Sequence, residues 1–543
     1  MEQKKQEGSR FLRTVEWLGN ALPHPVILFI ILIAILLVSS AIGQYFGVSV
    51  PDPRPEGAKG RAEDGIIHIV SLLDAEGIRK IIANVVTNFT GFAPLGTVLV
   101  ALLGVGIAER AGLLSAAMRL VVTKAPRKLT TMAIVFAGIM SNTAAELGYV
   151  VLIPLAAIIF HSLGRHPLAG LAAAFAGVSG GYSANLLLGT VDPLLSGITQ
   201  QAAQIIDPTY IVGAEANWYF MFASTFLITI LGYLITEKIV EPQLGPYTGG
   251  AVDDDENSLY ASANVTPLEK KALFWASVTF WGLAALLALM VVPENGILRN
   301  QDTGLVSNSP FLKGIVVFIF VFFAVPGIVY GYIAKTMRSD KDIVDAMAGA
   351  MSTLGLYLVI IFFAAQFVAF FGWTNIGQVI AVKGANFLNS IDLHGGVLFI
   401  GFILICAFIN LMIGSASAQW AVTAPIFVPM LMLAGYAPET IQAAYRIGDS
   451  VTNIITPMMS YFGLIMAIVV KYKKDAGIGT LVSMMLPYSI IFLIGWSLFF
   501  IVWVFVLGIP VGPGSPIISR REVKYSLFSL YKLKKLLIKA AFL

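Results

Sequence analysis

Two stretches of this sequence decide its fold: FAGIMSNTAAELGYVVLIPLAAIIF at residues 136–160 and FINLMIGSASAQWAVTAPIFVPMLM at residues 408–432. In each stretch an apolar run meets small hydroxyl and amide residues, at 141–143 and 415–417, and then resumes as a second apolar run that carries a proline. Backbone that leaves a helix within a bilayer is tolerated only where it is buried in protein or lines an aqueous cavity. The two stretches therefore predict re-entrant elements inside a membrane protein.

A second polar break follows in each copy, where an asparagine precedes a proline: Asn185 before Pro193, and Asn453 before Pro457. The two copies agree in the order of their features more than in identity. Small polar residues also allow close helix packing, which would explain a single break. Paired breaks in two copies instead favour the binding site of a transporter.

The composition of the chain agrees with this assignment. Of 543 residues, 57% are hydrophobic and 12% charged, and the mean hydropathy is +0.83. Soluble proteins carry about 25% charged residues, so a soluble enzyme or a nucleic-acid binder is excluded as the main function. Apolar runs such as residues 25–42 are continuous, whereas the strands of a membrane barrel alternate. We expect an all-α polytopic membrane protein.

Charge and polarity divide the chain into two membrane halves. Clusters of Lys and Arg in short connections place the N-terminus and the central loop on the cytoplasmic side. The lone cysteine, Cys406, excludes an intramolecular disulfide. The predicted segments are a cytoplasmic N-terminus at 1–24, a first membrane half at 25–236 with a hairpin around 128–162, a cytoplasmic loop at 237–271, a second membrane half at 272–510 with a hairpin around 395–434, and a basic C-terminal tail at 511–543.

Ionisable residues inside apolar segments are candidates for function. Arg446 and Asp449 share one helix face with Asn453, because they lie three and four residues apart. Either the two charges neutralise each other locally, or Arg446 offers its planar guanidinium to a substrate carboxylate while Asp449 helps to bind a coupling ion. Asp192 precedes a proline and is either a helix cap or a break in the transport path. Glu146 is a fourth candidate whose depth the sequence leaves open.

Trp420 follows the second break directly, close to Ser417. It is either a packing residue or a platform for an aromatic substrate. The sequence contains no HExxH, GxSxG or P-loop motif. We therefore expect no enzyme activity and no ATP-driven pumping, which leaves ion-coupled transport.

Residues 141–157 (SNTAAELGYVVLIPLAA) and the long segment from Gly414 to Gly463, with the order of the spans, resemble the p-aminobenzoyl-glutamate transporter (AbgT) family, nearest to its antimetabolite exporters. The resemblance covers most of residues 10–513. It implies about nine transmembrane helices and two re-entrant helical hairpins in an inverted repeat, a homodimer, and no cofactor beyond Na⁺ as a coupling or structural ion.

The resemblance also implies which residues form the site. The substrate route would be lined by Asp192, Ser417, Trp420, Pro438, Arg446, Asp449 and Pro457. The Na⁺ site would be formed by Asn410 and Asp449, with Ser141, Asn142, Thr143, Asn185 and Asn453 as weaker candidates. The second break reads Ser-Ala-Ser and lacks the asparagine of the first, which puts an equivalent second sodium site in doubt.

The function predicted from these features is Na⁺- or H⁺-coupled secondary transport of p-aminobenzoate or p-aminobenzoyl-glutamate compounds, with export of sulfonamide antimetabolites. We expect a multi-pass protein of the bacterial inner membrane, with the lipid bilayer, a small aromatic carboxylate or sulfonamide and a second copy as its partners, and no nucleic acid. The alternatives are a sodium-coupled dicarboxylate or citrate carrier, a membrane-embedded amidase and a channel.

Overall fold

The computed structural model describes residues 24–54, 56–57, 60–144, 148–247, 264–306, 309–457 and 459–516. Within these ranges the regular structure is helical, apart from the short antiparallel pair β1 (Ser49–Pro51) and β2 (Ile66–His68). Eight of the described helices are long and apolar enough to cross a membrane, and four shorter apolar helices accompany them. The predicted all-α polytopic class is confirmed.

The first half starts with α2, which leads through the β1–β2 pair to α3. Its helices are α2 (Pro25–Tyr45), α3 (Ala75–Thr90), α4 (Ala93–Ala111), α5 (Leu113–Lys124), α6 (Thr130–Ser141), α7 (Ile153–Ser162), α8 (Pro167–Phe175), α9 (Val191–Ala203), α10 (Trp218–Ile235) and α11 (Glu241–Leu244). Short 3₁₀ turns lie at Arg127–Leu129 and Asn142–Ala144, and π-helical turns at Gly148–Leu152, Ala176–Gly180 and Thr236–Val240.

The second half repeats this order after one additional helix, α13. Its helices are α13 (Pro267–Val291), α14 (Pro310–Lys313), α15 (Ile315–Ala334), α16 (Asp340–Ser352), α17 (Gly355–Trp373), α18 (Ile376–Ser390), α19 (Gly395–Asn410), α20 (Ala416–Leu433), α21 (Pro438–Asn453), α22 (Phe462–Tyr472) and α23 (Ile478–Ile501), which runs on as a π-helical turn at Val502–Val506.

All four breaks read from the sequence fall at helix ends or between helices. In the first copy α6 ends at Ser141, and in the second α19 ends at Asn410 before α20 begins at Ala416. The later breaks separate residue 180 from α9 and Asn453 from α22. Glu146 lies outside the described residues, as do residues 1–23 and the tail from residue 517 onward.

The described ends of the predicted central loop are helical. Helical structure continues from α10 through α11 to Leu244, and α13 starts at Pro267. The early start of α13 has a local cause, because Thr266 and Glu269 form a reciprocal capping box around a proline in the first turn. Residues 248–263, which include the acidic run, lie outside the described residues.

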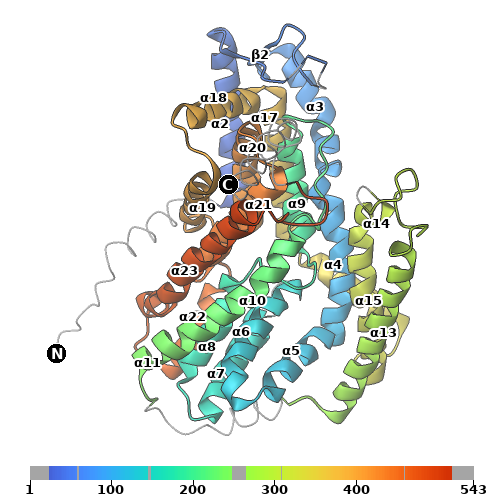
Figure 1. Ribbon diagram of the computed structural model, residues 1–543, viewed down its shortest axis with the longest axis vertical. Coiled ribbons are helices and arrows are strands. Elements are labelled where there is room, and N and C mark those ends of the chain that lie inside the picture. The colour runs from blue at the N-terminus through green and yellow to red at the C-terminus, as the bar shows by residue number, and fades with distance from the viewer. Residues whose placement is uncertain are drawn as a thin grey trace, which may run out of the picture.

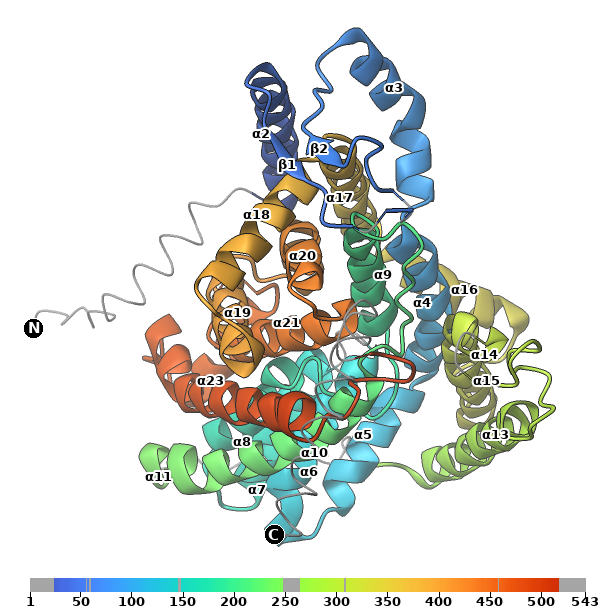
Figure 2. The ribbon, with the colours of Figure 1, turned by 45° about the horizontal axis from the view of Figure 1, so that its top comes forward.

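The helices pack in two groups. Figure 1 shows α15 beside α4 along one side of the molecule, with α13 packed on α15, and Figure 2 shows α16 beside α4. In the other group, α21 is surrounded by α9, α19, α20 and α23 (Figure 2). Every residue of α21 up to Thr452 is buried. A helix buried on all sides in a polytopic protein is expected to be apolar, so the polar residues of α21 need partners inside the protein.

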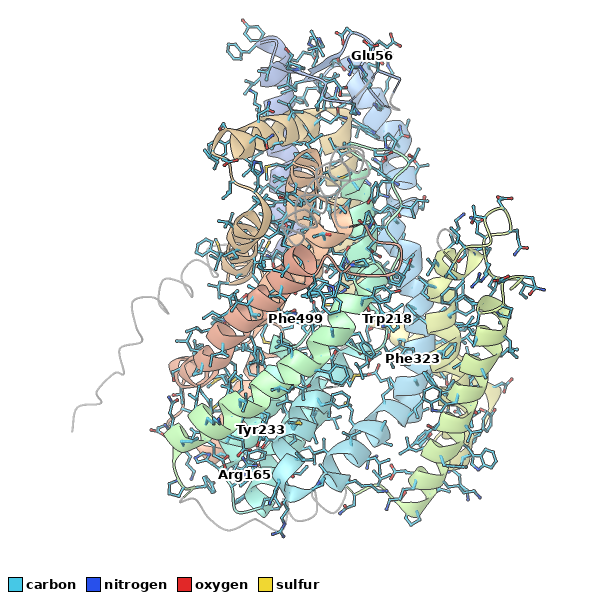
Figure 3. All side chains as sticks on the ribbon, viewed as in Figure 1. Glu56, Arg165, Trp218, Tyr233, Phe323 and Phe499 are labelled. Atoms are coloured by element: carbon cyan, nitrogen blue, oxygen red, sulfur yellow. The ribbon has the colours of Figure 1, made fainter. Side chains whose placement is uncertain are left out.

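The two ends of the molecule are fastened by different polar clusters. Figure 3 places Glu56, beside the β1–β2 pair, and Arg165 at opposite ends. Arg165 joins three helices, because it donates to Thr131 on α6, to Glu237 at 2.6 Å after α10, and to Glu241 on α11. Beside the β1–β2 pair, Asp52 and Arg54 form a buried ion pair. These clusters hold the ends of the helices in register.

We predict that Gly104→Ala destabilises the protein by about 1–3 kcal/mol, the usual cost of an overpacked contact. A Cβ atom at Gly104 of α4 would stand 2.3 Å from the carbonyl oxygen of Phe320 in α15, where only backbone can yield. Gly96→Ala, on the same helix with no atom within 4 Å of the added carbon, is the matched control and should be neutral or stabilising. Thermal unfolding in detergent compares the two, and equal midpoints would contradict the predicted contact.

Candidate functional site

The polar centre of the protein lies on α21. Arg446 is 2% exposed and Asp449 is not exposed at all. A buried charge is very costly unless an opposite charge and hydrogen bonds compensate it. The contacts of these two residues therefore define the site.

Arg446 pairs with Asp192, which belongs to the other copy of the repeat. Its Nη1 donates to Oδ1 of Asp192 at 2.7 Å, and its Nη2 donates to the carbonyl oxygen of Ser183 at 3.0 Å. The second carboxylate oxygen of Asp192 accepts the backbone N–H of Gly189 at 2.8 Å. The ion pair thus joins α21 to the second break of the first copy, and the local Arg446–Asp449 ion pair considered from their spacing is not formed.

Asp449 lies instead beside Asn410, the last residue of α19. The Asn410 amide donates to the carbonyl oxygen of Asp449 at 2.7 Å, to Oγ1 of Thr452 at 3.0 Å and to Oδ1 of Asn453 at 2.8 Å. Oδ1 of Asn410 and Oδ2 of Asp449 are buried, and neither accepts a hydrogen bond from the described residues. Oxygen atoms without donors suit a hard cation, which binds oxygen ligands. The end of α19 and the middle of α21 therefore offer a candidate Na⁺ site.

The corresponding residues of the first copy are arranged differently. Asn185 donates to Oγ1 of Thr143 at 3.2 Å. Ser141 donates to the carbonyl of Gly138, so its hydroxyl hydrogen is held within α6. Both amide atoms of Asn142 are buried and lack a hydrogen-bond partner among the described residues. The first break has an unpartnered amide but no carboxylate comparable with Asp449 among these contacts.

Trp420 is enclosed by protein. It is fully buried, and its ring stacks on Tyr445 with 4.2 Å between the ring centroids. Its indole N–H donates to Thr199 on α9 at 2.8 Å, and Thr199 donates in turn to Oε1 of Gln442 at 2.6 Å. In this conformation Trp420 ties α20 to α9 and α21.

The three remaining predicted residues lie at chain breaks around α21. Pro438 is the buried first residue of α21, a position where the missing N–H of proline costs nothing. Pro457 is half-buried between α21 and α22. Ser417, in the first turn of α20, is half-buried with its hydroxyl 3.4 Å from that of Ser415. The chain thus brings all three to the same group of helices as Arg446.

Several residues of this centre were missed in the sequence. Tyr445 donates to the carbonyl oxygen of Ala416 at 2.6 Å and lies 3.5 Å from Oδ1 of Asp449. Thr199 and Gln442 complete the Trp420 network. These three residues are polar side chains on buried helices, which is the only sign of them in the sequence. A neutral polar residue is weaker evidence of function than a charged one.

Comparison with known proteins gives one family. Residues 10–519 match the AbgT putative transporter family. A p-aminobenzoyl-glutamate transport protein of Escherichia coli (strain K12) is 41% identical over 501 residues, which cover 92% of this chain and 95% of that protein.

Two solved structures share the fold. MtrF of Neisseria gonorrhoeae, described as illuminating a class of antimetabolite efflux pumps, has a TM-score of 0.89 and 75% identity over 93% of this chain and 100% of its own. The YdaH transporter of Alcanivorax borkumensis has a TM-score of 0.83 and 44% identity over 90% of this chain and 100% of its own. The resemblance seen in the sequence is confirmed, and this chain is a transporter of the AbgT family.

Proposed function

We propose that this chain is an ion-coupled carrier of p-aminobenzoate and p-aminobenzoyl-glutamate compounds that exports sulfonamide antimetabolites. The names of its relatives support p-aminobenzoyl-glutamate and antimetabolites as substrates. The observation that carries the proposal is the buried Arg446–Asp192 pair, which spans the two broken copies of the repeat. The protein is a carrier rather than an amidase, and it acts as a homodimer in the bacterial inner membrane with its N-terminus in the cytoplasm.

Arg446 is the residue that recognises the carboxylate of the substrate. Its planar guanidinium can hold a carboxylate through two parallel hydrogen bonds. Its Nε–H has no acceptor among the described residues. A buried guanidinium needs an anion in every state, so the substrate carboxylate replaces that of Asp192 as the substrate enters. Exchange of one carboxylate for another avoids leaving either charge uncompensated.

The coupling ion binds three residues away on the same helix. Na⁺ would be held by Oδ1 of Asn410 and Oδ2 of Asp449, the two donor-free oxygens. A cation there offsets the negative charge of Asp449, which lies one turn from Arg446. Because α21 carries both sites, binding of the ion and of the anionic substrate favour the same position of this helix. Trp420, Ser417, Pro438 and Pro457 line the route that opens when α20 and α21 separate.

We predict that Arg446→Ala lowers flux of p-aminobenzoate in proteoliposomes by about tenfold or more, because it leaves a buried carboxylate without its counter-charge. Arg446→Lys should recover only part of the flux, since lysine lacks the bidentate fork. Arg119→Ala is the matched control: Arg119 forms an ion pair of 2.6 Å with Glu269 between α5 and α13. Unchanged flux in monodisperse Arg446→Ala protein would sink this assignment.

We predict that Na⁺, compared with choline, stabilises the protein against thermal unfolding by about 1.4 kcal/mol at ten times its dissociation constant. Asp449→Asn and Asn410→Ala should each abolish this increment, because each removes one donor-free oxygen ligand or its charge. Asn185→Ala tests the first copy in parallel and should leave the increment intact. Full Na⁺ stabilisation in Asp449→Asn would show that the ion binds elsewhere.

A further inference from the structure

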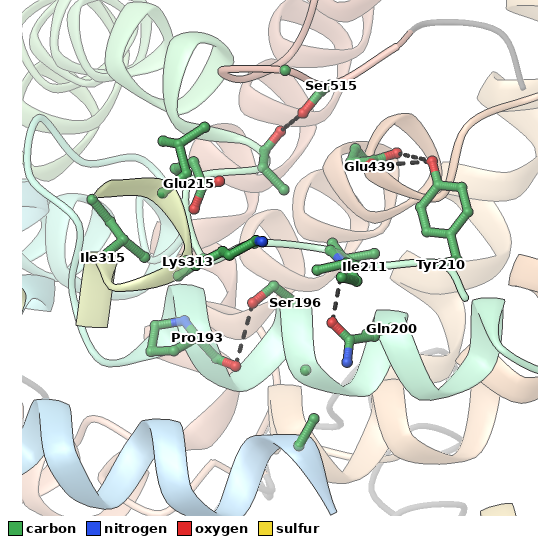
Figure 4. A pocket seen from close by; sticks show the side chains of 18 of the residues that line it. Pro193, Ser196, Gln200, Tyr210, Ile211, Glu215, Lys313, Ile315, Glu439 and Ser515 are labelled. Carbon is green, nitrogen blue, oxygen red and sulfur yellow. Dashed lines mark hydrogen bonds between the residues drawn. The ribbon is translucent and has the colours of Figure 1, made fainter. Parts of the chain in front are cut away.

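A cavity of about 800 Å³ lies between α9 and the start of α21. Figure 4 shows its walls: one face of α9, the connection between α9 and α10, the short helix α14, the start of α21 and the segment 513–516. Pro193, the residue after Asp192, is part of the α9 wall. The cavity wall is therefore separated from Asp192, in the proposed substrate site, by a single peptide bond.

One carboxyl group in the wall has no role in the contacts described so far. Glu215 is 8% exposed, and its Oε2 is buried without a hydrogen-bond partner among the described residues. The carboxyl folds back over Gly213, where a Cβ atom would stand 2.3 Å from Oε1, so a side chain at position 213 would displace the carboxyl. The segment 511–516 closes over the same turn, and Ser515 donates to the carbonyl oxygen of Ala216 at 2.7 Å.

The other charged groups of the cavity leave Glu215 without a counter-charge. Asp207, in the same α9–α10 connection as Glu215, accepts hydrogen bonds from the backbone N–H and the hydroxyl of Thr209. From α21, Glu439 accepts the hydroxyl of Tyr210 at 3.0 Å. Lys313 of α14 is the one base in the described lining and forms no ion pair with Glu215, while α4, α9, α15, the end of α20 and 513–516 contribute no titratable group. Burial raises the pKa of Glu215 to about 7.

The turn that carries Glu215 touches both halves of the proposed transport site. Asn217 donates to the carbonyl oxygen of Glu439, in the first turn of α21, at 2.8 Å. Trp218 donates from its indole nitrogen to the carbonyl oxygen of Leu186 at 3.0 Å. Leu186 belongs to the same break as Gly189, which holds Asp192. A change in the charge of Glu215 therefore acts on a turn that is hydrogen-bonded to α21, which carries Arg446, and to the break that precedes Asp192.

We propose that Glu215 is a proton-binding residue of the transport cycle, which exchanges its proton with water in this cavity. The carboxylate gains one proton to become a neutral acid, the form suited to the closed turn, and returns it to water when the turn opens. The inference deepens the proposed function and rests on it, because it adds a coupling proton to the Na⁺ proposed for that carrier.

Glu215→Gln fixes the neutral state, since glutamine has nearly the same shape and does not titrate. In proteoliposomes the wild type should accumulate p-aminobenzoate when a pH gradient is imposed. The variant should accumulate at least about tenfold less. Counterflow of labelled against unlabelled p-aminobenzoate moves no net proton and should persist in the variant. Asp207→Asn changes an acid of the same cavity whose Oδ1 accepts two hydrogen bonds from Thr209; it is the matched control and should keep both activities.

Gradient-driven accumulation at the wild-type level in Glu215→Gln would overturn the proposal. Loss of counterflow as well would overturn it too, because it would assign Glu215 to substrate binding or to folding. A wild-type protein that does not transport p-aminobenzoate would instead refute the proposed substrate. The next measurement would still decide whether Glu215 binds a proton.

That measurement is the pH dependence of thermal unfolding. Because the pKa of folded Glu215, about 7, lies above that of an exposed glutamate, the stability that its protonation contributes is complete in acid and is lost as the pH rises through 7. The unfolding midpoint of Glu215→Gln should therefore rise relative to the wild type between about pH 5 and pH 8. A constant difference between the two midpoints over that range would refute proton binding by Glu215.

Discussion

The ion pair between Arg446 and Asp192 is the constraint on which the centre of this protein depends. The guanidinium lies on a helix that is buried along nearly its whole length, so it needs a compensating anion inside the protein. That anion comes from the other copy of the repeat, at the start of α9. The second break of the first copy must reach α21 for this to happen, and Ser183 and Gly189 in that break hold the two partners. The break before α9 is thus what allows Asp192 to compensate the buried charge of Arg446.

The surroundings of α21 follow from the same requirement. Asn410 donates its amide hydrogens to α21, and both its Oδ1 and Oδ2 of Asp449 are buried without a hydrogen-bond partner among the described residues. Trp420 and Tyr445 stack where α20 meets α21, and Thr199 links them to α9. Arg446 and Asp449, the residues that we propose bind the anionic substrate and the cation, therefore stand on one helix and are held by the same neighbouring elements. In the proposed function, this single helix responds to both the substrate and the ion.

The sequence predicted the helical class and the positions of the breaks because both depend on local composition. An apolar run of about 20 residues has few alternatives to a membrane helix, and polar residues within such runs mark breaks directly. The sequence also singled out Arg446, Asp449 and Asp192 as charges in apolar surroundings. It did not determine which of two carboxylates pairs with Arg446, because one is three residues away and the other 254 residues away. The same limit hid Thr199 and Glu215, whose importance comes from tertiary neighbours.

The helix α13 has a geometric consequence. It belongs to neither copy of the repeat, and it places one additional crossing between them. In Figure 1, α2 rises toward the β1–β2 pair, whereas its counterpart α15 descends from α14. The second copy is thereby turned upside down relative to the first. The two halves of one motif face each other across a pseudo-two-fold axis, so a movement that opens one half toward one side of the bilayer has a counterpart, in the other half, that opens toward the opposite side.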